Sequence, residues 1–144
     1  MVEPDAQLDA IARQIVDISF QLHRDIGPEL LESAYETLLS AKLTASGMDV
    51  ERQVAVDVVV DGLRLNSAFR IDLLVNRAII IEVKSVEKTL PVHSKQLLTY
   101  LRLGGFPLGF VINFGTAMFR DGIRRLINSD ALLAPSRLGA NQKD

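Results

Sequence analysis

The apolar positions in the first third of the chain recur every three or four residues. This spacing runs through residues 5–24 and again through residues 29–46, and it places apolar side chains on one face of an α-helix. Asp5 can cap the start of the first helix, and Gly27 and Pro28 separate it from the second. The pattern therefore predicts two consecutive amphipathic helices.

After Met48 the period of the apolar positions changes to two. Valine occupies positions 54, 56, 58 and 60, and alternation of this kind is typical of a half-buried strand. Asp61 and Gly62 then form a strong signal for a two-residue hairpin turn. A second strand is expected over residues 63–75, with a bend near residues 66–67.

A continuous apolar run follows the next turn, which is expected at residues 76–77. Residues 78–84 read Ala-Ile-Ile-Ile-Glu-Val-Lys, and an unbroken run rich in β-branched side chains favours a strand that is covered on both faces. This third strand is predicted to extend to residue 86.

The rest of the chain predicts a helix, a strand and a short helix. Pro91 opens a helix over residues 92–103, and a fourth, buried strand follows over residues 108–114. Because a strand–helix–strand unit crosses over right-handedly, the fourth strand should run parallel to the third. Asp121 can cap a short C-terminal helix at residues 122–128.

The predicted elements follow the order α-α-β-β-β-α-β-α, which indicates an α/β fold of the α+β type with a mixed sheet flanked by helices. Residues 1–130 are predicted to form a single domain, since 144 residues are enough for one hydrophobic core. Residues 131–144 include proline, glycine and a polar end, and they are predicted to form a flexible tail.

Composition narrows the class of protein and the kind of metal site. Hydrophobic residues make up 48% of the chain and charged residues 24%, as in an ordinary globular protein. The chain has no cysteine and two histidines, so thiolate sites are excluded and any metal ion is expected to be oxygen-bound. No apolar run approaches the ~20 residues of a membrane span, and no basic signal segment opens the chain. The cytoplasm is therefore the expected compartment.

The charge balance argues against bulk electrostatic binding of nucleic acid. Sixteen lysines and arginines against eighteen acidic residues leave a formal charge of -2. Cations nevertheless gather in the middle of the chain, at Arg52, Arg64, Arg70, Arg77, Lys84, Lys88 and Lys95. They either line a local basic groove or are scattered over a solvated surface, and the sequence leaves both interpretations open.

Asp72, Glu82 and Lys84 are the strongest candidates for chemistry. Glu82 and Lys84 point to the same side of the third strand, and Asp72 interrupts the apolar second strand. Burying two such carboxylates is costly unless a cation joins them. A Mg²⁺ or Mn²⁺ ion would meet this need and could activate water against a phosphate. The alternative is a solvated strand end with ordinary ion pairs.

The register of the hairpin decides whether the two acids can act together. A two-residue loop at 76–77 would set Asp72 opposite Ile81, with the acids on opposite faces of the sheet. A three-residue loop at 76–78 would instead set Asp72 opposite Glu82. A shared metal site therefore requires the second register.

Side chains from two predicted helices could add to this site. Glu32 and Glu36 lie one turn apart, and they could extend the metal site or simply form a solvated acidic face. His93, Gln96 and Tyr100 share a polar stripe on the third predicted helix. They could hold the substrate or make ordinary half-buried hydrogen bonds.

These residues also carry a family resemblance. Asp72 with Glu82-Val83-Lys84, on a β-hairpin after a helix, resembles the PD-(D/E)XK nuclease superfamily, and further segments resemble its small GxxExxY family. Those segments are residues 26–28, 30–36, 69–75, 90–93, 96–101, 112–114 and 121–123. The resemblance covers roughly residues 8–128, with Glu29 standing where the first glycine of the family motif is expected.

The resemblance implies a restriction-endonuclease-like αβββαβ core, here with an extra N-terminal helix and a short C-terminal helix. It implies that Glu32, Asp72 and Glu82 are acids that bind Mg²⁺ or Mn²⁺. Lys84 would be the catalytic lysine, and Gln96 and Tyr100 match a helix motif of exonuclease-like branches.

A metal-dependent nuclease acting on DNA, or on RNA, is the first functional hypothesis. A homodimer is compatible with it, because a duplex has two strands to cut. The second hypothesis is a non-catalytic module that binds nucleic acid or a protein partner on a nuclease scaffold. The third is a structural domain that dimerises through its apolar first helix. Titration with a divalent metal distinguishes the first hypothesis from the second.

Overall fold

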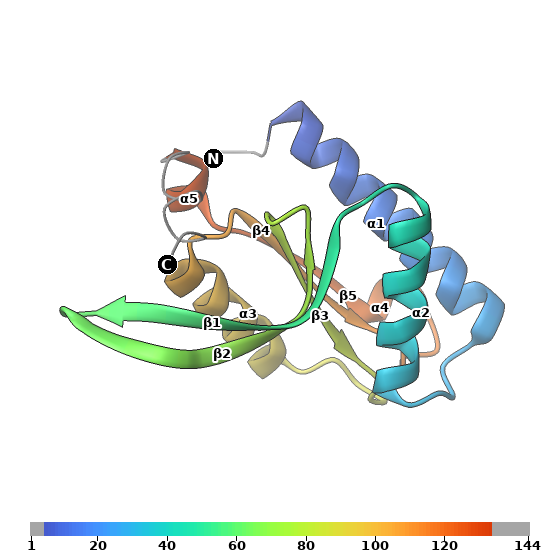
Figure 1. Cartoon of the computed structure of the whole chain (residues 1–144). Helices are drawn as coiled ribbons and strands as arrows, with labels where there is room; N and C mark the ends of the chain where they lie inside the picture. The colour runs from blue at the N-terminus through green and yellow to red at the C-terminus, as the bar shows by residue number, and fades with distance from the viewer. Residues whose placement is uncertain (1–4, 134–144) are drawn as a thin grey trace.

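In the computed structural model, which describes residues 5–133, five strands form one mixed sheet with helices packed on both faces (Figure 1). The strands lie side by side in chain order: β1 (Val50–Val60), β2 (Leu63–Val75), β3 (Ile79–Lys84), β4 (Leu108–Asn113) and β5 (Ile123–Ile127). The helices are α1 (Ala6–Ile26), α2 (Glu32–Ala45), α3 (Pro91–Gly104), α4 (Phe119–Gly122) and α5 (Ser129–Leu133). The predicted mixed α/β fold class is confirmed.

The central strand β3 is covered on both faces, as its apolar run predicts. Ile79 and Ile81 belong to the hydrophobic cluster formed with α1 and α2, whereas Ile80 belongs to the cluster formed with α3. All three isoleucines are fully buried, and each such side chain contributes about 1.5–3 kcal/mol on leaving water. Glu82 and Lys84 extend from the end of this strand, which the two layers of helices hold in place.

The hairpin of β1 and β2 is long and extends beyond the rest of the sheet (Figure 1). Asp61 and Gly62 both have positive φ angles, 52° and 78°, which is the two-residue turn that Asp-Gly favours. The pairing between the strands shifts at Asp57, where the carboxylate accepts the backbone N–H of Ser67 at 2.7 Å. The predicted bend at residues 66–67 is therefore a β-bulge.

The connection through α3 has the predicted topology. β4 runs parallel to β3, with Ile79 paired to Leu108 and Lys84 paired to Asn113, as a right-handed crossover requires. Gly105 caps the end of the helix, and its φ of 74° lies in the left-handed region that glycine occupies without strain.

Residues 122–128 form mainly a strand where the sequence pattern predicts a helix. β5 pairs antiparallel with β4 along its whole length. Its apolar positions, 123, 126 and 127, fit a helical spacing as well as a strand, and pairing satisfies the backbone groups along the edge of β4. This tertiary contact overrides the local pattern, so the predicted C-terminal helix is wrong at these positions. The short helix α5 follows instead.

The predicted tail is only partly described. Residues 131–133, the first of the predicted tail, belong to α5, and residues 134–144 lie outside the described residues, so the flexible tail stays a prediction. Within residues 5–133, no helix is both long enough and apolar enough to cross a membrane.

Candidate functional site

The hairpin of β2 and β3 brings the two strand acids together. Its last regular pair joins Leu73 to Ile81, so the loop consists of the three residues 76–78. The first two of them have positive φ angles of 51° and 53°. Of the two registers that the sequence allows, this is the one that sets Asp72 opposite Glu82.

Beyond the Leu73–Ile81 pair, the carboxylates of Asp72 and Glu82 take the place of backbone carbonyl oxygens as hydrogen-bond acceptors. The Glu82 carboxylate accepts the backbone N–H of Asp72 at 3.0 Å, and the Asp72 carboxylate accepts the backbone N–H of Val83 at 2.9 Å. In an ordinary ladder these N–H groups would donate to carbonyl oxygens of the facing strand. The reciprocal bonds hold the two carboxylates side by side where regular pairing ends.

Burial disfavours two free anions at this place. Glu82 is 6% exposed, and burial, followed by the charge of Asp72, raises the pKa of Glu82 to about 8. Burial is also the main reason that the pKa of Asp72 lies above its ordinary value. At neutral pH the pair therefore favours a bound proton or a bound cation.

The start of α2 places a third acid, Glu32, near this pair. Its carboxylate accepts a hydrogen bond from the backbone N–H of Ser85, and the Ser85 hydroxyl donates to the Leu30 carbonyl at 2.7 Å. Partial burial raises the pKa of Glu32, while the nearby Lys84 opposes this shift and the charge of Asp72 adds to it. Glu32 thus lies within electrostatic reach of both residues.

Tyr35 fixes the segment that precedes Glu32. Its ring is fully buried and stacks on Phe114, with the ring centroids 4.7 Å apart. Its hydroxyl donates to the Gly27 carbonyl and accepts the backbone N–H of Leu30. The tyrosine three residues after Glu32 therefore anchors the turn that leads into α2.

Tyr100 on α3 lies near the acids from another direction. Its ring stacks on Phe69, with centroids 4.2 Å apart and the planes at 6°. Burial, and then the charges of Glu82 and Asp72, raise the pKa of Tyr100. Gln96 hydrogen-bonds to the same hydroxyl, so these two residues of the predicted polar stripe act as a pair.

His93 has a structural contact of its own. Its Nδ1 accepts the backbone N–H of Leu90 at 3.3 Å, which satisfies a free donor at the start of α3. Partial burial, followed by the positive charge of Lys84, lowers the pKa of His93. The imidazole is therefore a helix cap close to the lysine of the site.

Two residues of β1, Arg52 and Gln53, belong to the surroundings of the site although their roles were not predicted. Glu36 is 7% exposed, pairs with Arg52 at 3.0 Å and accepts the side-chain amide of Gln53 at 2.7 Å. The same amide donates to the Asp72 carboxylate at 3.3 Å. Glu36 is therefore not part of a solvated acidic face, because it links α2 to β1 beside the acids.

Replacing Arg52 with methionine is expected to lower the free energy of unfolding by about 1–3 kcal/mol, because a nearly buried Glu36 carboxylate would lose its charged partner. Urea denaturation of the purified variant measures this. The matched control is Arg13→Met, which removes an ion pair whose arginine side chain is 79% exposed, and its cost should stay below ~0.5 kcal/mol. Equal effects of the two substitutions would contradict the anchoring role of Arg52.

The donor set suits a hard divalent cation in an open site. Across the described residues, no group of three or more histidine, aspartate or glutamate side chains is gathered closely enough to hold a metal ion. Two adjacent carboxylates, Asp72 and Glu82, nevertheless match the one or two protein carboxylates with which Mg²⁺ is usually bound, its other positions being left to water and phosphate. Their burial and raised pKa values fit the same need for a cation.

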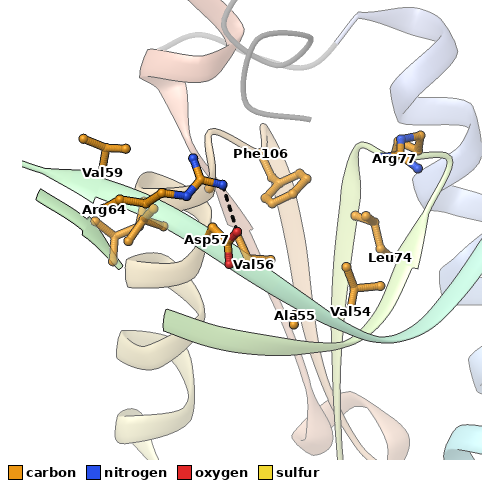
Figure 2. Close-up of a pocket in the computed structure, with 12 residues that line it drawn as sticks. Val54, Ala55, Val56, Asp57, Val59, Arg64, Leu74, Arg77 and Phe106 are labelled. Carbon is orange, nitrogen blue, oxygen red and sulfur yellow. Dashed lines mark hydrogen bonds and ion pairs between the residues drawn. The ribbon is translucent and has the colours of Figure 1, made fainter. Parts of the chain in front are cut away.

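A separate hollow of about 280 Å³ lies between the β1–β2 hairpin and the end of α3 (Figure 2). Most of the residues that line it are apolar, with Phe106 on one side, and the ion pair of Arg64 and Asp57 lies on its polar side, with the two side chains 3.0 Å apart. None of the site candidates named above lines it. The candidate site is therefore at the ends of the central strands and not in this hollow.

The mixed five-stranded sheet and its helices are consistent with a restriction-endonuclease-like fold. The family model of the PD-(D/E)XK nuclease superfamily matches residues 9–126, and the chain therefore belongs to this superfamily. No significant match to the chain was found among curated proteins or among solved structures.

Proposed function

We propose that the protein is a metal-dependent nuclease that hydrolyses phosphodiester bonds of DNA, or of RNA, and that it belongs to the GxxExxY branch which its motifs resemble. The observation that carries this proposal is the pair of adjacent carboxylates, half-buried Asp72 and buried Glu82, with Lys84 two residues beyond Glu82 on the same strand. Membership of the superfamily supports nuclease chemistry and a nucleic-acid substrate.

The proposed site has distinct roles for its acids. Asp72 and Glu82 would hold a Mg²⁺ or Mn²⁺ ion, and Glu32 would reach it directly or through water. When bound, such an ion polarises the phosphate and lowers the pKa of water. The raised pKa of Glu82 means that this residue gives up a proton when it takes up the cation.

The remaining side chains act on the substrate. Lys84 would position the attacking water and neutralise negative charge that develops on the phosphate. Tyr100 and Gln96, which are hydrogen-bonded to each other, would orient the scissile phosphate. His93 lies near Lys84 and would contact the substrate backbone.

Cleavage assays on single-stranded and double-stranded DNA and RNA, with Mg²⁺ or Mn²⁺, test the proposal. The expected result is cleavage of at least one substrate that stops on addition of a chelator and is abolished by Asp72→Ala. The control is Asp61→Ala, at the turn of the β1–β2 hairpin, which should cleave like the wild type. Activity that survives Asp72→Ala would belong to another site or to a contaminant.

A second candidate function is a binding module that grips nucleic acid without cutting it. It is favoured by the backbone N–H donors that already satisfy the Asp72 and Glu82 carboxylates, and by the raised pKa that lets Glu82 remain neutral without a metal ion. Calorimetric titration separates the two functions. Nucleic-acid binding without any uptake of divalent ions at millimolar concentration would favour the binding module.

A further inference from the structure

Gln53 has an unusual backbone conformation for its position. Its φ is 51°, in the left-handed region that residues other than glycine rarely occupy. It lies on β1 between two regular pairs with β2, at the position opposite Asp72. Backbone strain of this kind persists only where the surroundings enforce it, and it is concentrated at functional sites.

Contacts at both ends of the residue enforce this conformation. The Gln53 carbonyl accepts a hydrogen bond from Arg70 at 3.2 Å. The side-chain amide donates to Glu36 Oε1 at 2.7 Å and to Asp72 Oδ1 at 3.3 Å. An amide nitrogen carries two hydrogens, so both carboxylates can be served at once. Glu36 is in turn held by Arg52, so the amide is itself anchored.

These contacts determine how the Asp72 carboxylate is oriented. Its Oδ2 accepts the Val83 N–H at 2.9 Å, while its Oδ1 accepts the Gln53 amide. Two donors on different oxygens fix the plane of the carboxylate and stop it from rotating. Each oxygen retains a further lone pair for a cation, so the two hydrogen bonds orient the group without blocking it.

We propose that Gln53 is a positioning residue, which holds the Asp72 carboxylate in the orientation that a divalent metal ion requires. This inference rests on the proposed function of Asp72 as a metal ligand. The network runs from Arg52 through Glu36 and Gln53 to Asp72, so helix α2 and strand β1 act together on one proposed ligand of β2. Outer contacts of this kind typically change metal affinity 10- to 100-fold.

The variant Gln53→Gly keeps the positive φ angle of the residue and removes its side-chain amide. Glycine adopts a positive φ without strain, which offsets part of the cost of losing the amide donor of the nearly buried Glu36 carboxylate, so the variant should still fold. The dissociation constant for Mn²⁺, measured by isothermal titration calorimetry, is expected to rise at least about tenfold. Thermal denaturation of the metal-free protein is expected to show a cooperative transition, which establishes that the variant folds.

Ser67→Gly is the matched control. Ser67 has φ of 50° in the same hairpin, and its backbone N–H binds Asp57. Glycine at this position should leave the Mn²⁺ dissociation constant at the wild-type value. A second variant, Gln53→Asn, keeps an amide on a side chain one carbon shorter, and asparagine tolerates the left-handed region. It is expected to weaken Mn²⁺ binding, and it replaces the glycine variant if that variant does not fold.

The possible results lead to different conclusions. If Gln53→Gly and Gln53→Asn both bind Mn²⁺ like the wild type, the positioning role of Gln53 is wrong while the proposed metal site stands. If the wild type itself takes up no Mn²⁺, the positioning role and the proposed nuclease site both fail. If both Gln53 variants lose affinity and Ser67→Gly does not, the role is supported.

Discussion

Replacing Lys84 with methionine is expected to lower the rate of phosphodiester cleavage about 10²- to 10⁴-fold, while Mn²⁺ affinity stays within about threefold of the wild type. Lys84 is the last residue of β3 and lies on the same side of the strand as Glu82. Its ammonium group would position the attacking water and offset charge that develops on the phosphate. Methionine keeps the aliphatic stem and removes both contributions.

The measurement has to separate loss of chemistry from loss of metal. Lys84 lowers the pKa of Glu82, so its removal makes Glu82 harder to ionise. Single-turnover rates and Mn²⁺ titrations are therefore compared at pH 9, above the pKa of about 8 of Glu82 in the wild type. Lys42→Met, which changes an exposed lysine near the end of α2, serves as the control and should cleave like the wild type.

Two results would change the role assigned to Lys84. A loss of Mn²⁺ affinity as large as the loss of rate would make the lysine a counterion of the acids and not a residue that acts on the substrate. An unchanged rate would exclude it from the reaction altogether.

The identity of the acids could be predicted from the sequence, but their register could not. Asp72 and Glu82 stand out because each interrupts an apolar strand, and a carboxylate is costly to bury unless it is paired or binds a cation. The loop between the strands contains no glycine to indicate its type. Asn76 and Arg77 both adopt positive φ angles, which their residue types do not predict. This loop conformation places Asp72 opposite Glu82.

Gln53 was missed because its position depends on a bulge. The register set by the Asp61-Gly62 turn, continued without interruption, would place Glu51 opposite Asp72. The shift at Asp57 moves β1 by two residues and brings Gln53 to that position. The shift is stabilised by the hydrogen bond from Ser67 to the Asp57 carboxylate. A contact between side chain and backbone across two strands therefore decides which residue lies opposite Asp72.

The environment of Glu36 on α2 could not be predicted from the sequence either. Its spacing from Glu32 correctly predicts that the two lie one turn apart. Spacing does not reveal that α2 is rotated so that Glu36 is 7% exposed and faces Arg52. Burial of a charged residue depends on its partner on β1, and a sequence pattern within one helix contains no information about that partner.

Glu82→Gln is expected to change how the stability of the metal-free protein depends on pH. Folding raises the pKa of Glu82 from 4.5 to about 8, so between these values the folded protein holds a proton that the unfolded chain has released. The stabilisation from this group is therefore complete below about pH 4.5 and is lost as the pH rises to about 8. At about 1.4 kcal/mol per pH unit, the loss amounts to roughly 3–5 kcal/mol.

Glutamine keeps the shape of the protonated acid and cannot ionise, so the variant should be more stable than the wild type at pH 8, with the difference shrinking toward pH 5. Urea denaturation at pH 5, 6, 7 and 8 measures this difference. The lowered pKa of His93 has the opposite effect on stability, because it stabilises both proteins as the pH rises. The unfolding free energy of the wild type is therefore subtracted from that of the variant at each pH. Mn²⁺ should stabilise the wild type at pH 8 far more than Glu82→Gln, since only the ionised carboxylate binds it well. Parallel curves for the two proteins would show that Glu82 is ionised throughout, and the case for a shared proton or cation at this site would then be lost.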